Sequence, residues 1–209
     1  MGLFFSSNSG GPAEFVDVPV TEFTPCAIML KKMGYRLVVL GFEEVALQQV
    51  DPAVREFRAG KTWVVSRYND TQRLRLIQRI SLHMNPNVSK WVMSLLAQGL
   101  VVSFITSETG QKNGECVHDD ASNRSGYQFQ GVPLLNRVVE EHWGREVTPY
   151  VRIKEGQRPW NLIKQLTKDY RLKPKEVLVV HQKPGLIRRA RERHMGGILV
   201  TDHQLGLQF

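Results

Sequence analysis

The sequence predicts an α/β fold, a Rossmann-like three-layer sandwich with a mainly parallel central sheet, because apolar runs alternate with segments of helical periodicity. The runs at 37–40, 100–105 and 177–180 are almost continuously apolar, which is typical of strands that are covered on both faces. The chain has 209 residues, of which 42% are hydrophobic, and this is enough for a single core. We therefore expect one domain.

The first part of the chain is predicted to hold a tail and a leading helix over 1–33, and the α/β domain follows over 34–209. Residues 61–66 (KTWVVS) are expected to form a short strand of a flap. A helix is predicted over 70–83 with Asp70 as its N-cap. No large cap domain fits between the first two strands, so the cap is minimal or absent.

The second half of the chain contains a long irregular loop over 109–131, rich in Gly, Ser, Asn and Asp. This loop carries four residues of metal-ligand type, Cys116, His118, Asp119 and Asp120. Their spacing matches no standard zinc pattern, so an ordinary polar loop is preferred to a metal site. Helices are predicted over 88–99 and 132–142, and a strand over 150–153.

Polar residues follow the predicted strands at their carboxyl ends. These residues are Gly41, Glu43, Thr106, His181 and Gln182. Because the carboxyl ends of parallel strands meet at one edge of the sheet, we expect all five positions to share one crevice. For His181 alone, a hydrogen-bonded histidine at a strand end is the preferred interpretation.

The order of these strands and polar residues resembles the haloacid dehalogenase (HAD) superfamily of phosphatases, whose first motif is a strand followed by Asp-x-Asp-x-Thr. Its second motif is a strand ending in Thr or Ser, which Thr106 matches in VVSFIT. Its third is a Lys near the next helix, replaced here by Arg158 in GQRPWNLIKQL, with Lys154 as an alternative. Its fourth is a strand ending in acidic residues, to which VLVVHQKP at 177–184 is similar. The resemblance spans residues 34–202.

The residues that carry the chemistry of this family are replaced. Gly41 stands at the position of the nucleophilic aspartate, and Glu43 at that of the general acid. His181 and Gln182 stand where an acidic pair would help to hold Mg²⁺. Aspartyl-phosphate chemistry needs both the covalent carboxylate and the cation. The resemblance therefore implies an HAD-like fold that is not an enzyme and has no metal and no other cofactor.

The leading functional hypothesis is a non-catalytic HAD-like protein, a pseudophosphatase, that acts as a structural or scaffolding component of a larger cytoplasmic assembly with protein partners. One alternative is a basic RNA-binding or ribonucleoprotein component. Another is a diverged phosphatase or phosphate-ligand sensor. The sequence contains no Walker loop, no G-x-G-x-x-G after a strand and no nucleophile elbow.

A pocket for anions is the one part of the HAD-like site that the sequence retains. The Thr106 hydroxyl, backbone N–H groups after the strand ends and the Arg158 guanidinium would together hold a phosphate group. The preferred alternative is that Thr106 satisfies a turn and Arg158 lies on the surface.

The chain is basic, with 28 Lys and Arg against 20 Asp and Glu, a net charge of +8 and a pI near 9.7. This balance favours an anionic partner, which is RNA, the cytoplasmic face of a membrane or an acidic protein surface. The densest basic patch is Arg188, Arg189, Arg191 and Arg193. It lacks the interleaved aromatic residues of RNA-recognition signatures, so a solvated helix face is preferred.

The N-terminus places Gly2 and Ser6 as in the N-myristoylation pattern, and an unmodified tail is the alternative. A single myristoyl chain gives only marginal membrane affinity. The two cysteines, Cys26 and Cys116, are too few for a disulfide framework, and the sequence has no membrane span. We expect a cytoplasmic protein, with membrane or cytoskeletal association as a further expectation.

Overall fold

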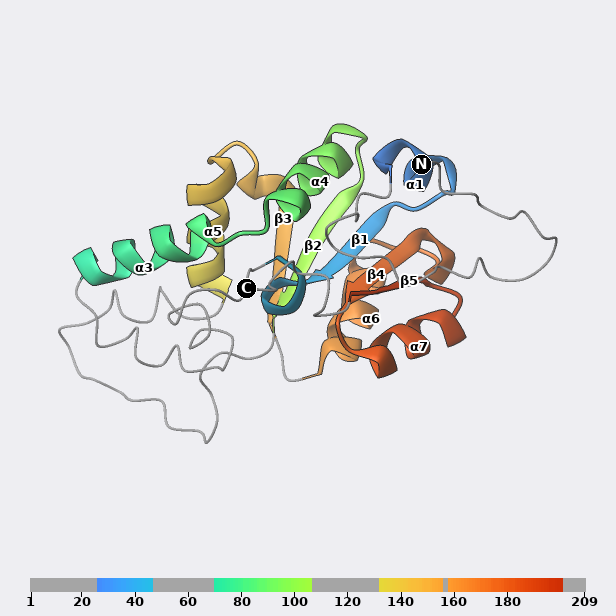
Figure 1. The fold of residues 1–209 in the computed structure, drawn as a ribbon. Helices are drawn as coiled ribbons and strands as arrows, with labels where there is room; N and C mark the ends of the chain where they lie inside the picture. The colour runs from blue at the N-terminus through green and yellow to red at the C-terminus, as the bar shows by residue number, and fades with distance from the viewer. Residues whose placement is uncertain (1–25, 47–69, 107–131, 156–157, 201–209) are drawn as a thin grey trace, which may run out of the picture.

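The computed structural model describes residues 26–46, 70–106, 132–155 and 158–200, and these form a parallel sheet covered by helices (Figure 1). All strand pairs are parallel, and the strand order is β3-β2-β1-β4-β5. The strands are β1 Leu37–Gly41, β2 Val101–Thr106, β3 Val151–Glu155, β4 Val177–His181 and β5 Gly196–Leu199. This arrangement confirms the predicted α/β, Rossmann-like fold.

Six α-helices lie in the described part of the chain, and each of them precedes a strand except α3, which precedes α4. They are α1 Ala27–Lys32, α3 Asp70–Leu82, α4 Pro86–Ala97, α5 Val132–Trp143, α6 Pro159–Asp169 and α7 Pro184–Glu192. Three shorter turns complete the described elements, the π-helical η1 Phe42–Ala46 and the 3₁₀ turns η4 Thr148–Tyr150 and η5 Pro174–Glu176. The predicted flap strand at 61–66 and the loop at 109–131 lie outside the described residues.

The sheet separates two apolar layers, because successive residues of a strand point to opposite faces. On one face, Val38 and Leu40 of β1 belong to a large buried cluster with residues of α1, α3, α4 and α5. On the other face, Leu37 and Val39 belong to a smaller cluster with residues of α6 and α7. Every residue of β1 is buried, as the continuous apolar run predicts.

The helix boundaries follow from capping residues. Helix α4 begins at Pro86, two residues before the predicted start, because Asn85 caps it: its Oδ1 accepts from the N–H groups of Asn87 at 2.9 Å and Val88 at 3.4 Å. Proline at the first position is also found in α6 and α7.

The helices that connect strands end where the strands begin, and a residue with positive φ follows each of them. Gly34 and Gly99 take this conformation after α1 and α4, which glycine adopts without a steric cost. Arg171 and His194 take it after α6 and α7 with φ values of 51° and 60°. Because α6 and α7 each connect two parallel strands, they start at the carboxyl edge of the sheet and end at its amino edge.

Candidate functional site at the carboxyl edge of the sheet

Three of the predicted positions meet at the ends of neighbouring strands. Gly41 ends the central strand β1, and Thr106 and His181 end the strands on either side of it. Gly41 pairs with Ile105, and Leu40 pairs with Val180, so the three strand ends are nearly level. Thr106 and His181 are 1% and 2% exposed, and so both polar side chains are buried at this edge.

The backbone around His181 fixes the orientation of its ring. The Nδ1 atom of His181 accepts a hydrogen bond from the Lys183 N–H at 3.2 Å. In the neutral ring the proton is therefore on Nε2, since only one of the two nitrogens carries it. The His181 carbonyl also accepts from the Val200 N–H at 3.1 Å. A strand-end histidine held by hydrogen bonds is thus what the structure contains.

Two helices begin beside these residues. Lys183 is the N-cap of α7, and its carbonyl accepts from Leu186 at 3.0 Å and Ile187 at 3.2 Å. Arg158 is the N-cap of α6, and no side-chain hydrogen bond caps that helix. The first N–H groups of a helix and its dipole both favour negative charge at the N-terminus. The carboxyl edge therefore combines buried polar groups with two positive helix ends.

The two candidates for the family's lysine position differ in their surroundings. The Arg158 side chain is exposed at the start of α6. The Lys154 ammonium lies 3.3 Å from the Asp169 carboxylate, so an acidic neighbour already balances its charge. This difference favours Arg158 as the cation that remains available to an anion.

The turn after β1 is packed by aromatic rings. Phe42 in η1 is fully buried and lies edge-on to Phe104 of β2, with ring centroids 5.3 Å apart. Glu43 is also in η1, and Gln182 is half-buried after β4. Gly41 itself supplies no side chain to the edge.

Magnesium prefers hard oxygen ligands and usually carboxylates. Among the side chains that the structure describes at the ends of β1, β2 and β4, the donors are the Thr106 hydroxyl, the His181 imidazole and the Gln182 amide, and these three do not fit that preference. Within the ranges that the structure describes, no group of three or more His, Cys, Asp or Glu could hold a metal ion. Cys116, His118, Asp119 and Asp120 lie outside those ranges, as does Gly2.

The predicted basic patch on α7 is divided between two environments. Arg191 turns toward β5 and donates to the Gly197 carbonyl from Nε at 3.3 Å and Nη2 at 3.0 Å. Arg189 lies over the Trp160 ring at 5.2 Å from its centroid. Arg188 and Arg193 are exposed, the former 4.0 Å from Glu192. The solvent-facing part of the patch is thus Arg188, Arg189 and Arg193.

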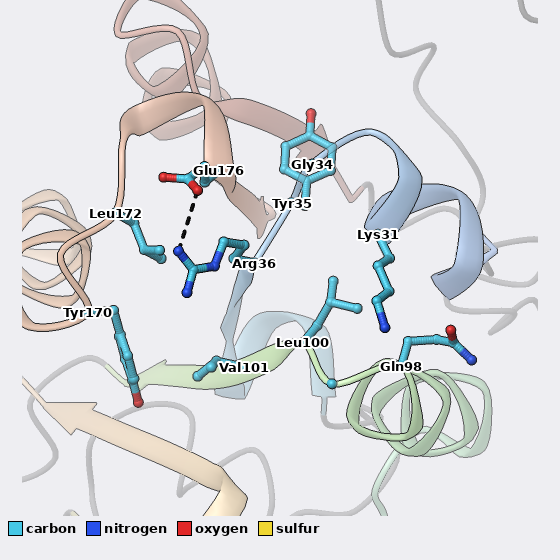
Figure 2. Close-up of a pocket in the computed structure, with 11 residues that line it drawn as sticks. Lys31, Gly34, Tyr35, Arg36, Gln98, Leu100, Val101, Tyr170, Leu172 and Glu176 are labelled. Carbon is cyan, nitrogen blue, oxygen red and sulfur yellow. Dashed lines mark ion pairs between the residues drawn. The ribbon is translucent and has the colours of Figure 1, made fainter.

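The sequence did not indicate a cavity of about 450 Å³ at the opposite, amino edge of the sheet. Figure 2 shows Lys31 and Gln98 on one side of it and Tyr170 and Leu172 on the other. Arg36 and Glu176 form an ion pair of 3.6 Å across its wall. The backbone N–H of Lys173 holds the pKa of Glu176 below its usual value, with a smaller effect from Arg36. No motif marks these residues, because they come from three separate stretches of the chain, 31–36, 98–101 and 170–176.

Comparison with known proteins gives fold similarity only. No family model matches the chain, and no curated protein matches its sequence. A predicted phosphoglycolate phosphatase from Haemophilus somnus has a similar structure, with 11% identity, a TM-score of 0.47 and coverage of 79% of this chain and 85% of that one. An HAD family enzyme from Bacteroides thetaiotaomicron, solved as a magnesium complex, has 10% identity, a TM-score of 0.41 and coverage of 80% and 94%.

A third similar structure is a haloacid dehalogenase-like family hydrolase from Streptococcus pneumoniae, with 10% identity, a TM-score of 0.41 and coverage of 82% and 90%. The predicted HAD-like fold is confirmed, since the strands with the first, second and fourth motifs, β1, β2 and β4, lie side by side at the centre of the sheet. At these identities the similarity concerns the fold and not the substrate.

Two functional expectations are corrected. The chain was expected to be a non-catalytic scaffold and not an enzyme, whereas the structures of similar fold are described as a phosphatase and as hydrolases. Gly41 and Glu43 do differ from the aspartates of the HAD motif, but the absence of one nucleophile does not by itself show that the chain is a scaffold.

The described helices include none that is long and apolar enough to cross a membrane.

Proposed function

We propose that the chain is a diverged phosphatase that binds a phosphate ester at the carboxyl edge of its sheet. The observation that carries this proposal is the meeting of buried Thr106 and His181 with the first turns of α6 and α7. Hydroxyl, N–H and guanidinium donors in such an arrangement suit the oxygens of a phosphoryl group. Arg158 is the cation proposed to close the site.

The proposed reaction is a direct transfer of the phosphoryl group to water. Gly41 cannot form the covalent intermediate that splits the reaction into two steps. Catalysis would then depend on positioning and on stabilisation of the charge of the transition state. Glu43, two residues after Gly41 in the sequence, is proposed as the general acid or base.

Ligand binding is tested by thermal unfolding with inorganic phosphate or p-nitrophenyl phosphate. A ligand at 100 times its dissociation constant stabilises a protein by about 2.7 kcal/mol, so a clear rise in Tm is expected. Thr106→Val removes the hydroxyl and should weaken phosphate binding, and Arg158→Ala should weaken it about tenfold. The matched control is Ser103→Ala on the same strand, whose hydroxyl donates to the Arg152 carbonyl at 3.2 Å, away from the edge.

Turnover is measured separately as release of p-nitrophenol with and without Mg²⁺. Glu43→Gln should lower the rate by about 10² to 10⁴ if Glu43 transfers the proton. A phosphate-dependent rise in Tm without turnover would show that the chain binds phosphate but does not hydrolyse it, and would overturn the proposed phosphatase activity. No rise in Tm with either compound would overturn the site itself.

The basic face of α7 and the cellular location are further proposals. Arg188, Arg189 and Arg193 are exposed and are proposed to contact an anionic partner of a cytoplasmic protein. If this partner is RNA, binding should fall steeply with salt, and charge reversal at Arg189 and Arg193 should weaken it. Binding that is indifferent to salt would exclude this role. The intact mass of natively expressed protein tests the proposed acylation of Gly2.

A further inference from the structure

A second group of polar side chains lies away from the strand ends, where α3, α4 and α5 meet. Ser89 comes from α4 and His142 from α5, and the Ser89 Oγ atom is 2.6 Å from the His142 Nε2 atom. On the other side of the same ring, the Ser81 Oγ atom of α3 is 3.4 Å from Nδ1. The imidazole is thus held between two hydroxyl groups from two other helices.

The contacts of the ring indicate which nitrogen carries its proton. The backbone of Ser81 raises the pKa of His142, as an accepting carbonyl near the ring does. Ser81 lies on the Nδ1 side, so a hydrogen on Nδ1 suits this contact. Nε2 is then the basic nitrogen of the neutral ring, and it accepts the hydroxyl proton of Ser89. This is the tautomer that a general base requires.

The protonation state of His142 agrees with this geometry. Burial lowers the pKa of His142, and the hydrogen bond to Ser81 opposes this shift only in part. The ring is therefore neutral at pH 7. The Trp143 ring lies edge-on to it, with centroids 4.7 Å apart, and closes its inner side.

An open cavity of about 490 Å³ gives access to these groups. Ser81, Ser89 and His142 all line it, together with Leu82, Met84, Pro86, Lys90 and Glu141. Leu82, Met84 and Pro86 supply apolar surface for the body of a small substrate. The charged residues that line the cavity are Lys90 on α4 and Glu141 on α5. The Lys90 cation beside the serine suits negative charge that develops on an acyl oxygen.

We propose that Ser89 and His142 form a serine–histidine hydrolytic site for small carboxylic esters, independent of the phosphate site. The Ser89 Oγ atom attacks the ester carbonyl carbon, and His142 Nε2 takes the proton of the hydroxyl. The bond from carbon to the leaving oxygen breaks, and the leaving alcohol receives that proton from His142. Water then attacks the acyl carbon and gives a proton to His142 Nε2, the bond from that carbon to Ser89 Oγ breaks, Ser89 Oγ regains the proton from His142, and the carboxylic acid is released. The Ser81 carbonyl orients the ring throughout.

The first experiment treats the full chain with an alkyl fluorophosphonate and locates the modified residue by mass spectrometry. Labelling of Ser89 is expected, and Ser89→Ala should abolish it. His142→Gln should slow it by about 10² to 10⁴. Ser94→Ala is the matched control, since Ser94 lies on the same helix, is exposed and donates to the Lys90 carbonyl at 3.0 Å. That variant should label at the unchanged rate.

A second measurement needs no variant. The labelling rate of the unaltered chain should rise with pH and reach a plateau, with its midpoint below the usual range for histidine. The same dependence is expected for hydrolysis of p-nitrophenyl acetate. A chain that does not react, reaction at another serine, or a rate that does not change between pH 4 and 8 would each overturn the proposal. Inorganic phosphate should leave the labelling rate unchanged, which separates this site from the phosphate site.

Discussion

The two edges of the central sheet differ in the solvent exposure of their polar side chains. At the carboxyl edge, Thr106 and His181 are 1% and 2% exposed. At the amino edge, the Arg36 side chain is 65% exposed and that of Glu176 21%, and they line an open cavity (Figure 2). The polar side chains described at the carboxyl ends of β2 and β4 are therefore buried, whereas those before β1 and β4 at the amino edge are solvated.

The direction of the helices explains which charge each edge favours. Helices α6 and α7 begin at the carboxyl edge, where the positive ends of their dipoles favour negative charge. Helices α1, α4, α6 and α7 end at the amino edge, where carbonyl groups prefer cations, and α1 carries Lys31 and Lys32 in its last turn. An anionic ligand therefore suits the carboxyl edge, although an open cavity of about 450 Å³ lies at the amino edge.

The largest effect is expected for His181→Ala. Its removal leaves a cavity in the buried polar layer and takes the acceptor from the Lys183 N–H. We expect a loss of about 2–3 kcal/mol in the free energy of unfolding, measured by urea denaturation. At the amino edge, Arg36→Ala should cost at most about 1 kcal/mol, because an exposed ion pair contributes little. Equal losses would break the distinction between the edges.

A smaller effect is expected for Gly196→Ala, which tests whether the amino edge is open throughout. An added Cβ would meet the Tyr35 hydroxyl and lie 2.8 Å from the Leu178 Cδ1 atom, so the buried Tyr35 ring must move. A loss of about 1–3 kcal/mol is expected by thermal or urea unfolding. Gly185→Ala in the first turn of α7 is the control, since nothing lies within 4 Å of its added Cβ. That control should be neutral or slightly stabilising.

The smallest effect concerns the pH dependence of the Glu176 contacts. The folded chain holds the pKa of Glu176 below its unfolded value, through the Lys173 N–H at 2.6 Å and then Arg36. The stabilisation is thus present above the unfolded pKa and is lost as pH falls through the folded pKa. Glu176→Gln should lower Tm slightly at pH 7, and the difference should vanish in acid. A difference that grows as pH falls would contradict the assignment.

The sequence predicted the scaffold well because periodicity within one segment reports which of its faces is buried. The continuous apolar run of β1 and the helical pattern of α5 both have the expected structure. It also placed Gly41, Thr106 and His181 together, since parallel strands must end at one edge. The basic patch shows the limit, because spacing along α7 could not reveal that Arg191 turns to the Gly197 carbonyl.

By itself, the sequence determined the order of strands and helices along the chain and the polar residues at the strand ends. Only the tertiary structure decided that Ser89 and His142, 53 residues apart, lie within hydrogen-bonding distance, and that three separate stretches of the chain surround the amino-edge cavity. The reason is that local periodicity acts within one element, whereas contacts between elements depend on how whole layers pack. The chemistry proposed for α4 and α5 therefore has no motif in the chain.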